Sequence, residues 1–183
     1  YKTEQESFWA GDFGNDYIDR CIGKEIVASN INFLCNSLKR ASNIHNCIEF
    51  GANIGNNLIA LSSLLPNVSL SAIEINKKAI SELSKIVPNG NIYEGSIFDY
   101  KPKKQFDLVL IKGVLQHLNP EYLEVVYSNL VQSCSKYILI ADFYNPKPVS
   151  VEYRGHQNKL FKRDFAGELI DNHPEMSLLD YGF

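Results

Sequence analysis

The segment from Glu49 to Gly55 constrains the fold of this chain more than any other. Its sequence, Glu-Phe-Gly-Ala-Asn-Ile-Gly, ends an apolar run that starts at Asn46 and leads into a helical pattern from Asn56 to Leu65. A strand, a glycine-rich turn and a helix therefore follow one another. Such a turn allows the backbone to approach a bound molecule closely, because glycine adopts positive φ without steric cost. The segment predicts an α/β fold with a ligand at the carboxyl end of this strand.

The rest of the chain alternates between strand and helix patterns. Apolar runs predict strands at residues 46–50, 69–74, 90–94, 106–111, 136–142 and 177–183. Helical spacing predicts helices at residues 24–40, 56–65, 76–86, 119–134 and 162–172. Short strands separated by helices of this length imply right-handed crossovers. We therefore expect a doubly wound, mainly parallel sheet that is covered on both faces.

A length of 183 residues with 45% apolar and 21% charged residues indicates one soluble domain spanning residues 1–183. Within it, residues 1–40 form an N-terminal helical cap. The segment from Phe143 to Lys159, with two prolines and a glycine, predicts a long irregular loop. We expect the sheet to finish with an antiparallel hairpin that is incomplete in this chain, since residues 177–183 supply only its first strand.

Charge and cysteine spacing exclude several classes of partner. The net charge of −3 and the pI near 5.8 argue against nucleic-acid or acidic-membrane binding. The cysteines at positions 21, 35, 47 and 134 are too far apart for a zinc site, so we expect no metal and four buried thiols in a reducing cytoplasm. No apolar run is long enough to span a membrane and no signal peptide is evident.

The spacing of small residues distinguishes between two kinds of cofactor. A dinucleotide fingerprint places its third glycine three positions after the second, but here the small residues stand at Gly51, Asn53 and Gly55. This spacing resembles motif I of class I methyltransferases, whose fold is Rossmann-like and whose cofactor is S-adenosylmethionine, with S-adenosylhomocysteine as product. Asn53 replaces the middle glycine, and Asn tolerates positive φ. A purely structural turn and an NAD-dependent oxidoreductase are the alternatives.

Further cofactor contacts are expected where the other strands end. Glu49 opens the motif, and Glu74, followed by Ile75, closes the next strand at the distance of a ribose-binding carboxylate. Ser96 and Ile97 follow the third strand and are expected beside the adenine, with Asp99 as a substitute for Ser96. The alternative for Glu74 is a solvated surface acid.

Acceptor binding and catalysis are assigned to residues that follow the fourth and fifth strands. Lys112 is expected near the cofactor's sulfonium, where a cation is favourable only beside an anionic acceptor. His117 and His156 are candidate bases, and Arg154 is suited to bidentate anion binding. The other expected acceptor contacts are Tyr144, Asn145 and Tyr153. The alternatives are a solvated lysine, a packed histidine, solvated loop residues and, for Lys162 to Asp164, an ordinary charged helix start.

Several longer segments resemble one group of class I methyltransferases, the pseudaminic acid biosynthesis-associated methylases. These segments are Thr3–Gly14, Glu49–Leu58, Lys112–Leu115, Tyr153–Gly155 and Phe161–Gly167. The resemblance runs nearly end to end, and Asn53 is a feature of the group. It implies a bacterial enzyme linked to nonulosonic acids or other surface glycans, with a lid over the cofactor formed by Phe8, Trp9, Phe13 and Tyr17. The alternative for these aromatic residues is packing on the core.

We therefore expect a methyltransferase that acts on oxygen or nitrogen of a small polar acceptor, a sugar acid or sugar nucleotide. Catalysis by such an enzyme depends on positioning and desolvation, since the methyl group is already activated. Two alternatives remain open: a methyltransferase of another small metabolite, and a cofactor-binding module without activity.

Overall fold

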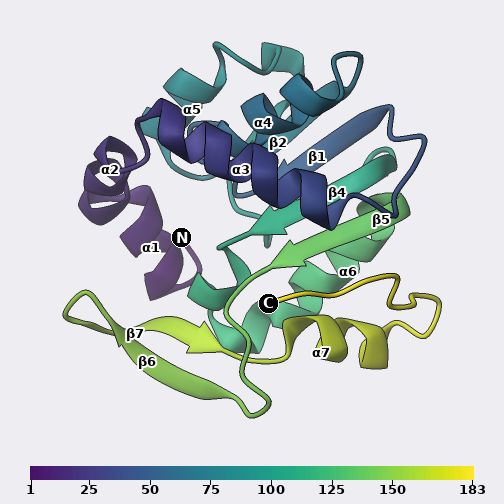
Figure 1. The fold of residues 1–183 in the computed structure, drawn as a ribbon. Helices are drawn as coiled ribbons and strands as arrows, with labels where there is room; N and C mark the ends of the chain where they lie inside the picture. The colour runs from purple at the N-terminus through teal and green to yellow at the C-terminus, as the bar shows by residue number, and fades with distance from the viewer.

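The computed structural model describes residues 1–183, apart from the side chain of residue 89. Its centre is a five-stranded sheet in the order β3-β2-β1-β4-β5, in which all neighbouring strands are parallel (Figure 1). The strands are β1 (Asn46–Phe50), β2 (Ser69–Glu74), β3 (Ile92–Glu94), β4 (Phe106–Lys112) and β5 (Cys134–Ala141). The strand order reverses direction at β1, so the crevice between β1 and β4 is the switch point where ligands bind in such sheets.

Helices cover both faces of this sheet (Figure 1). One face carries α3 (Lys24–Ser37), α4 (Asn56–Leu64) and α5 (Lys77–Leu83), and the other carries α6 (Leu123–Ser133) and α7 (Phe165–Asn172). Three short 3-10 helices complete the connections: η1 (Asn89–Asn91), η2 (Leu115–His117) and η3 (Pro120–Tyr122). None of the described helices combines the length and the apolarity that a bilayer crossing requires.

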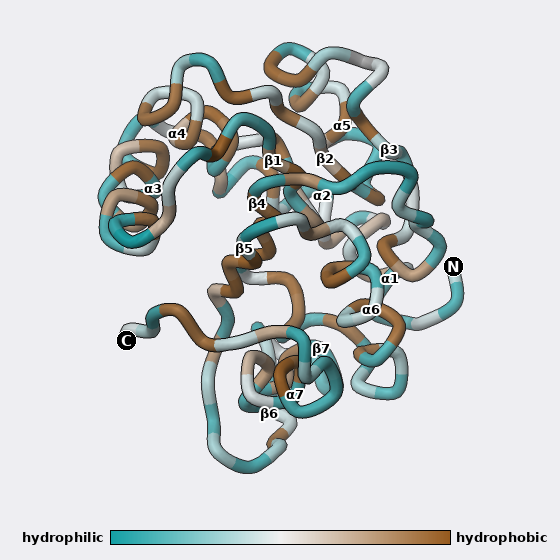
Figure 2. The backbone as a smooth tube through the Cα atoms, turned by 90° about the vertical axis from the view of Figure 1, so that its right-hand side faces the viewer, coloured by the Kyte–Doolittle hydropathy of each residue, from teal (hydrophilic) through white to brown (hydrophobic). Residues whose placement is uncertain are grey.

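The hydrophobic core has two parts, one on each face of the sheet. Along β4, Val109 and Ile111 pack toward α6 and α7, while Leu108 and Leu110 pack toward α3 and α4. All four side chains are completely buried. This uninterrupted apolar run is typical of a central parallel strand, because both of its faces are covered. Figure 2 shows the hydrophobic residues concentrated on the strands and on the inner sides of the helices. The predicted Rossmann-like, mainly parallel fold is confirmed.

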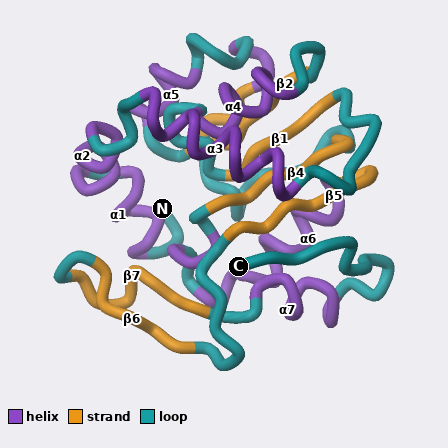
Figure 3. The backbone as a smooth tube through the Cα atoms, viewed as in Figure 1, coloured by secondary structure: helices purple, strands orange, loops and turns teal.

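Two further elements lie at the carboxyl edge of the sheet. The N-terminal helices α1 (Glu4–Ala10) and α2 (Asp12–Asp19) lie beside an antiparallel hairpin of β6 (Val149–Tyr153) and β7 (His156–Lys162), as Figures 1 and 3 show. The Gln5 side chain donates to the carbonyl oxygen of Asn158 at 2.9 Å and thereby links helix and hairpin. We call these two elements together, residues 4–19 and 149–162, the cover.

The predicted strand at residues 177–183 is wrong. This segment follows α7 as an irregular coil, and Leu178, Leu179, Tyr181 and Phe183 are exposed. Leu179, Tyr181 and Phe183 alternate with Asp180 and Gly182 as a strand would, but all three are exposed and the segment pairs with no strand of either sheet. The antiparallel hairpin instead precedes α7 and forms a separate two-stranded sheet.

The predicted loop from Phe143 to Lys159 is also wrong in part, because it contains β6 and the start of β7. Arg154 and Gly155 connect the two strands with φ angles of 52° and 82°. Two consecutive positive φ angles are the requirement of a type I′ hairpin turn. The two prolines lie before the hairpin, at 146 and 148, and therefore do not interrupt its ladder.

The four cysteines are free thiols, but the prediction that all are buried is wrong. Only Cys47, on β1, is buried, and Cys35, on α3, is exposed. Cys35 occupies the solvent-facing side of an amphipathic helix whose apolar side packs on α4.

Two of the predicted helices are shorter in the structure than expected, because α3 ends at Ser37 and α5 ends at Leu83.

Candidate cofactor and acceptor site

The turn between β1 and α4 has the backbone conformation that its small residues predict. Gly51, Asn53 and Gly55 have φ angles of 74°, 49° and 86°. A Cβ atom added to Gly51 would lie 2.7 Å from a methyl group of Val114, so space as well as backbone conformation requires glycine there. The turn therefore brings bare backbone to the carboxyl end of the central strand.

Glu74, at the end of β2, holds this turn in place. Its Oε2 accepts from the Asn53 backbone N–H at 2.7 Å, and its Oε1 accepts from the N–H groups of Ile75 and Asn76, both at 2.8 Å. Burial raises the pKa of Glu74, while these three backbone donors act in the opposite direction. A carboxylate offers about four acceptor positions, so Glu74 keeps one for a further donor. Its solvated-acid alternative is excluded, since Glu74 is only 7% exposed.

Glu49 is the second buried carboxyl group at this edge, and it is 1% exposed. Its Oε1 accepts from the Asn57 side chain at 2.6 Å, whereas its Oε2 is buried without a hydrogen-bond partner among the described residues. Burial raises the pKa of Glu49 to about 8, and the nearby Lys112 ammonium lowers it in part. A polar atom left unpaired inside the protein is unfavourable, so this oxygen is available to a ligand group or to water.

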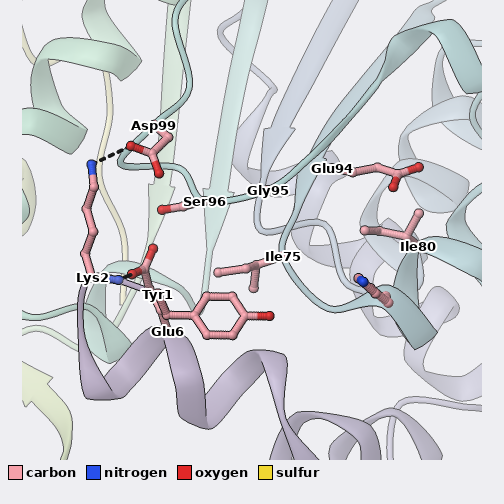
Figure 4. A pocket seen from close by; sticks show the side chains of 10 residues that line it. Tyr1, Lys2, Glu6, Ile75, Ile80, Glu94, Gly95, Ser96 and Asp99 are labelled. Atoms are coloured by element: carbon pink, nitrogen blue, oxygen red, sulfur yellow. Dashed lines mark hydrogen bonds and ion pairs between the residues drawn. The ribbon is translucent and has the colours of Figure 1, made fainter.

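A cavity of about 420 Å³ opens beside the end of β3 (Figure 4). Its lining includes Ile75 and Ser96, which are both predicted cofactor contacts, and also Glu6, Asp99 and Lys2. Its full lining consists of Tyr1, Lys2, Glu6, Ile75, Lys77, Ile80, Glu94, Gly95, Ser96 and Asp99.

Ile97 does not line this cavity. It is 8% exposed and lies in the core that faces α6, where its carbonyl oxygen accepts from the Asn129 side chain at 2.9 Å. The apolar side chains that line the cavity are instead those of Ile75 and Ile80.

Lys112, at the end of β4, has a different environment from the one expected. Its positive charge lowers the pKa values of Glu49 and Asp142, and its Nζ lies 5.7 Å from the centre of the Phe33 ring. Two carboxyl groups of the protein thus lie within electrostatic reach of the ammonium. An acceptor anion is not required to balance this charge.

The four predicted lid residues gather in one aromatic cluster. Trp9 meets Phe8, Phe13 and Tyr17 edge to face, with ring centres 5.8, 5.4 and 5.2 Å apart. The hairpin contributes Tyr153, whose ring lies 6.2 Å from that of Trp9. Aromatic contacts between the N-terminal helices and the hairpin therefore help to hold the cover together.

His156 joins the same cluster from the hairpin. Its exposed ring lies 4.9 Å from that of Phe8 and 5.5 Å from that of Phe13. The structure thus places this candidate base at the outer side of the cover.

His117 is packed inside the protein, which favours the alternative to a catalytic base. Its Nδ1 lies 2.6 Å from the carbonyl oxygen of Lys159, and its Nε2 lies 3.2 Å from the Gln116 amide nitrogen. The Gln116 oxygen accepts from the Phe143 N–H at 3.0 Å, so its NH₂ group faces His117 and donates to Nε2. This network assigns a neutral ring that is protonated on Nδ1. Burial lowers the pKa of His117 to about 4.

The predicted acceptor contacts lie in two separate places. Arg154 lies at the tip of the hairpin over the Tyr153 ring, so it belongs to the cover. Tyr144 instead packs on Phe183 with ring centres 5.5 Å apart, and the Asn145 side chain donates to the Lys147 carbonyl oxygen. The structure does not bring Tyr144 and Asn145 into the aromatic cluster.

Asp142 follows β5 and was not predicted as a site residue. Its Oδ1 accepts from the Gln116 N–H at 3.2 Å, and its Oδ2 is buried without a partner among the described residues. Burial raises its pKa to about 7, against the lowering by backbone donors of η2 and by Lys112. The signal that identifies it is its position, since Glu49 and Glu74 are also acids at strand ends.

These residues fit S-adenosylmethionine. The unpaired Oε2 of Glu49 suits a cationic amino group, the remaining acceptor position of Glu74 suits a ribose hydroxyl, and the cavity beside Ser96 suits a purine. No pyrophosphate is needed to satisfy any of these groups. Among the described side chains, no cluster of three His, Cys, Asp or Glu residues is arranged to hold a metal ion.

Comparisons with known proteins agree with this geometry. Residues 48–136 match a family model described as a methyltransferase domain. A search of curated protein sequences gives no match.

Three solved structures illustrate the likeness in fold. DesVI of Streptomyces venezuelae is 13% identical, with a TM-score of 0.57 over 85% of this chain and 67% of its own. The plantazolicin methyltransferase BpumL in complex with SAH is 20% identical, with a TM-score of 0.60 over 76% of this chain and 57% of its own. The sugar N-methyltransferase KedS8 from Streptoalloteichus sp is 15% identical, with a TM-score of 0.59 over 77% of this chain and 61% of its own.

The chain thus spans between 57% and 67% of the length of these structures. The likeness shows the class I methyltransferase fold. Together with the methyltransferase domain at residues 48–136, it supports an enzyme that transfers a methyl group and S-adenosylmethionine as its cofactor.

Proposed function

We propose that this protein is an S-adenosylmethionine-dependent methyltransferase that acts on a small polar acceptor of bacterial surface glycan biosynthesis. One observation carries the methyltransferase part: the Glu49–Gly55 turn, with three positive φ angles, is fixed by Glu74 at the switch point of the sheet. In this proposal Glu49 holds the amino group of the cofactor, Glu74 its ribose, and the cavity beside Ser96 its adenine.

The cofactor, when bound, supplies a methyl group on a positive sulfonium. The residues of the chain bind and orient the reactants and exclude water, which are the main contributions that such a transfer requires. In this proposal Trp9 and Tyr153 shield the site from water on the side of the cover, because their rings pack together across its two parts. His117 supports these rings, with centres 4.7 Å from Trp9 and 4.8 Å from Tyr153.

A base is needed only for an acceptor that is protonated at working pH. His117 is engaged at both ring nitrogens, so it does not take this role. His156 lies exposed at the outer side of the cover, so no base is assigned, and Lys112 is assigned to the electrostatic balance of Glu49 and Asp142.

The acceptor is proposed from two sources of support. The sequence resembles methylases associated with pseudaminic acid biosynthesis, and a solved structure with the same fold is a sugar N-methyltransferase by its printed name. A sugar acid or sugar nucleotide, available in the cytoplasm, is the substrate class that we propose. Its anionic group would be met by Arg154 at the hairpin tip. Methylation of another small metabolite and binding without turnover are the competing functions.

The cofactor assignment is tested by ligand-induced stabilisation. S-adenosylhomocysteine is expected to raise the melting temperature of the wild-type chain, whereas NAD is not. Glu74→Gln keeps the size of the side chain but replaces an acceptor oxygen with a donor that faces backbone N–H groups. We therefore expect it to cost about 1 to 3 kcal/mol of stability and to weaken S-adenosylhomocysteine binding about tenfold. Stabilisation by NAD alone would overturn the assignment.

The acceptor is tested in cells. Mass spectrometry of extracts with and without the gene is expected to show a glycan precursor that lacks one methyl group in the deletion strain. Arg154→Ala is the matched variant, because it is expected to retain S-adenosylhomocysteine binding and to lose acceptor use. Cofactor binding without turnover on any sugar acid or sugar nucleotide would identify a binding module instead.

A further inference from the structure

Glu6, on α1, has one carboxylate oxygen that its structural role does not use. The Glu6 side chain is 5% exposed and lines the cavity beside Ser96. Its Oε2 accepts from the backbone N–H groups of Lys2 and Thr3 at 2.6 and 3.1 Å. Its Oε1 is buried and has no hydrogen-bond partner among the described residues.

The capping box of α1 accounts for only half of this arrangement. Thr3 and Glu6 exchange hydrogen bonds between side chain and backbone, which fixes the start of the helix. This motif needs one acceptor atom at the third helical position, and glutamine provides it as well as glutamate. The second oxygen is thus left over, in a buried place where an unpaired acceptor is unfavourable.

Two of the other polar side chains around the cavity, Asp99 and Ser96, already have partners, whereas Glu94 and Tyr1 are exposed to solvent. Asp99, which the sequence offered as an adenine ligand, forms an ion pair with the Lys2 ammonium. The Ser96 hydroxyl accepts from the Phe98 N–H at 3.0 Å. Figure 4 shows Glu6 across the cavity from Ser96 and Asp99, with one oxygen bonded to the Lys2 backbone and the other directed toward the cavity.

We propose that Oε1 of Glu6 accepts a hydrogen bond from the 6-amino group of the cofactor's adenine, so that the N-terminal helix selects a 6-amino purine. The inference rests on the proposed function, because it assumes that the cavity receives the adenine. A carboxylate oxygen accepts and never donates, so it attracts an amino group and repels the carbonyl oxygen of a 6-oxo purine. The N-terminal segment is then part of the cofactor site itself.

The substitution Glu6→Gln reverses the polarity at this one position. The glutamine oxygen must remain on the Lys2 and Thr3 N–H groups, because only an acceptor fits there. The glutamine NH₂ group then occupies the position of Oε1 and faces the cavity as a donor. This variant keeps the capping box, so it changes the ligand contact and leaves the helix start intact.

The experiment measures the binding of two ligands by calorimetry: S-adenosylhomocysteine and its 6-oxo analogue, S-inosylhomocysteine. The wild type is expected to prefer S-adenosylhomocysteine by about tenfold or more, the effect of one hydrogen bond to a charged group. Glu6→Gln is expected to weaken S-adenosylhomocysteine and to strengthen the analogue, which narrows the preference by about tenfold or reverses it. Glu4→Gln, on the exposed side of the same helix, is the matched control and is expected to keep the wild-type preference.

A preference that is unchanged in Glu6→Gln would overturn the proposal, whether both affinities fall equally or neither changes. An equal fall in both affinities would mean that Oε1 binds a ribose hydroxyl or only stabilises the fold.

If Glu6→Gln lowers the melting temperature of the ligand-free protein, the same two affinities are measured for a second variant, Glu6→Asp. Aspartate keeps an acceptor, so lower affinity for both ligands with a retained preference is expected, and a lost preference would contradict it. Failure of the wild type to bind S-adenosylhomocysteine at all would overturn the proposed function as well.

Discussion

The two sides of the proposed site are built by different interactions. The floor, which we define as the Glu49–Gly55 turn with Glu74, is fixed by backbone hydrogen bonds to one carboxylate. The cover is held by aromatic contacts together with the Gln5–Asn158 hydrogen bond and the Glu4–Lys159 ion pair. It leaves three polar atoms buried without partners among the described residues: Gln5 Oε1, Glu6 Oε1 and Trp9 Nε1. On the floor, the buried atom without a hydrogen-bond partner among the described residues is Oε2 of Glu49.

This difference indicates which side a ligand completes. The floor keeps its geometry without a ligand, because the three backbone hydrogen bonds to Glu74 hold the turn in its positive φ angles. The cover holds three buried polar atoms without partners, which is unfavourable unless a ligand or water pairs with them. We infer that substitutions on the floor affect folding and binding together, whereas substitutions on the cover act mainly through ligand contacts.

The largest expected effect is a loss of stability when a glycine of the floor is replaced, compared with the same replacement in the cover. Gly51 on the floor and Gly155 on the cover have similar φ angles, 74° and 82°. A Cβ at Gly51 would meet Val114 at 2.7 Å, while a Cβ at Gly155 would meet nothing within 4 Å. Gly51→Ala is therefore expected to cost roughly 2 to 6 kcal/mol of stability, from backbone strain and overpacking together. Urea unfolding of the purified variants measures this cost.

Gly155→Ala is the control for backbone strain alone. It is expected to cost about 1 to 2 kcal/mol, because only the left-handed conformation is penalised. Equal losses in the two variants would show that the contact with Val114 does not limit the floor, and the distinction drawn between the two sides would fail.

An intermediate effect is expected from pH at His117, which packs against the cover. Because the folded pKa of His117 is about 4, below its unfolded value of 6.5, the unfolded chain binds more protons between these pH values. Stability from His117 is complete above pH 6.5 and falls as the pH decreases toward 4. The expected loss is about 2 kcal/mol at pH 5 relative to pH 8.

The measurement compares the wild type with His117→Asn, which keeps a donor for the Lys159 carbonyl oxygen. Glu49 and Asp142 have raised pKa values and change stability in the opposite direction, with the loss as the pH rises. They are present in both proteins, so the difference between the two pH profiles isolates His117. Parallel profiles would show that this histidine titrates normally in the folded protein.

The smallest expected effect concerns the ion pair that joins the cover to α5. Lys78 Nζ lies 3.2 Å from Asp19 Oδ1, and the two side chains are 49% and 68% exposed. Pairs of this kind contribute about 0 to 1 kcal/mol, so Asp19→Asn is expected to change stability by less than about 1 kcal/mol. A larger loss in thermal unfolding would mean that this contact, and not the aromatic cluster, attaches the cover.

The sequence predicted the five parallel strands and the glycine turn, because both depend on residues close together in the chain. Apolar runs such as that of β4 and the small residues at positions 51, 53 and 55 need no knowledge of distant contacts. The hairpin was missed because its turn residues, Arg154 and Gly155, are a less usual type I′ pair than Asn-Gly.

The site was predicted less completely than the fold. Acids at strand ends identified Glu49 and Glu74, and the same rule would have identified Asp142. The packing of His117 was not decided by sequence, because its ring contacts come from Lys159, Trp9 and Tyr153. Burial decides between a base and a packed ring, and burial depends on all of these segments.

By itself, the sequence determined a strand, a tight turn and a helix at residues 46–64, since φ preferences and hydrophobic periodicity are local properties. Only the tertiary structure decided that Glu6 lines the cavity beside Ser96 and that the first helix meets the hairpin. The contact of Gln5 with Asn158 joins residues 153 positions apart, and no local pattern specifies such a pair. The physical reason is that the burial and the hydrogen bonding of a side chain depend on residues that are distant in the sequence and pack around it.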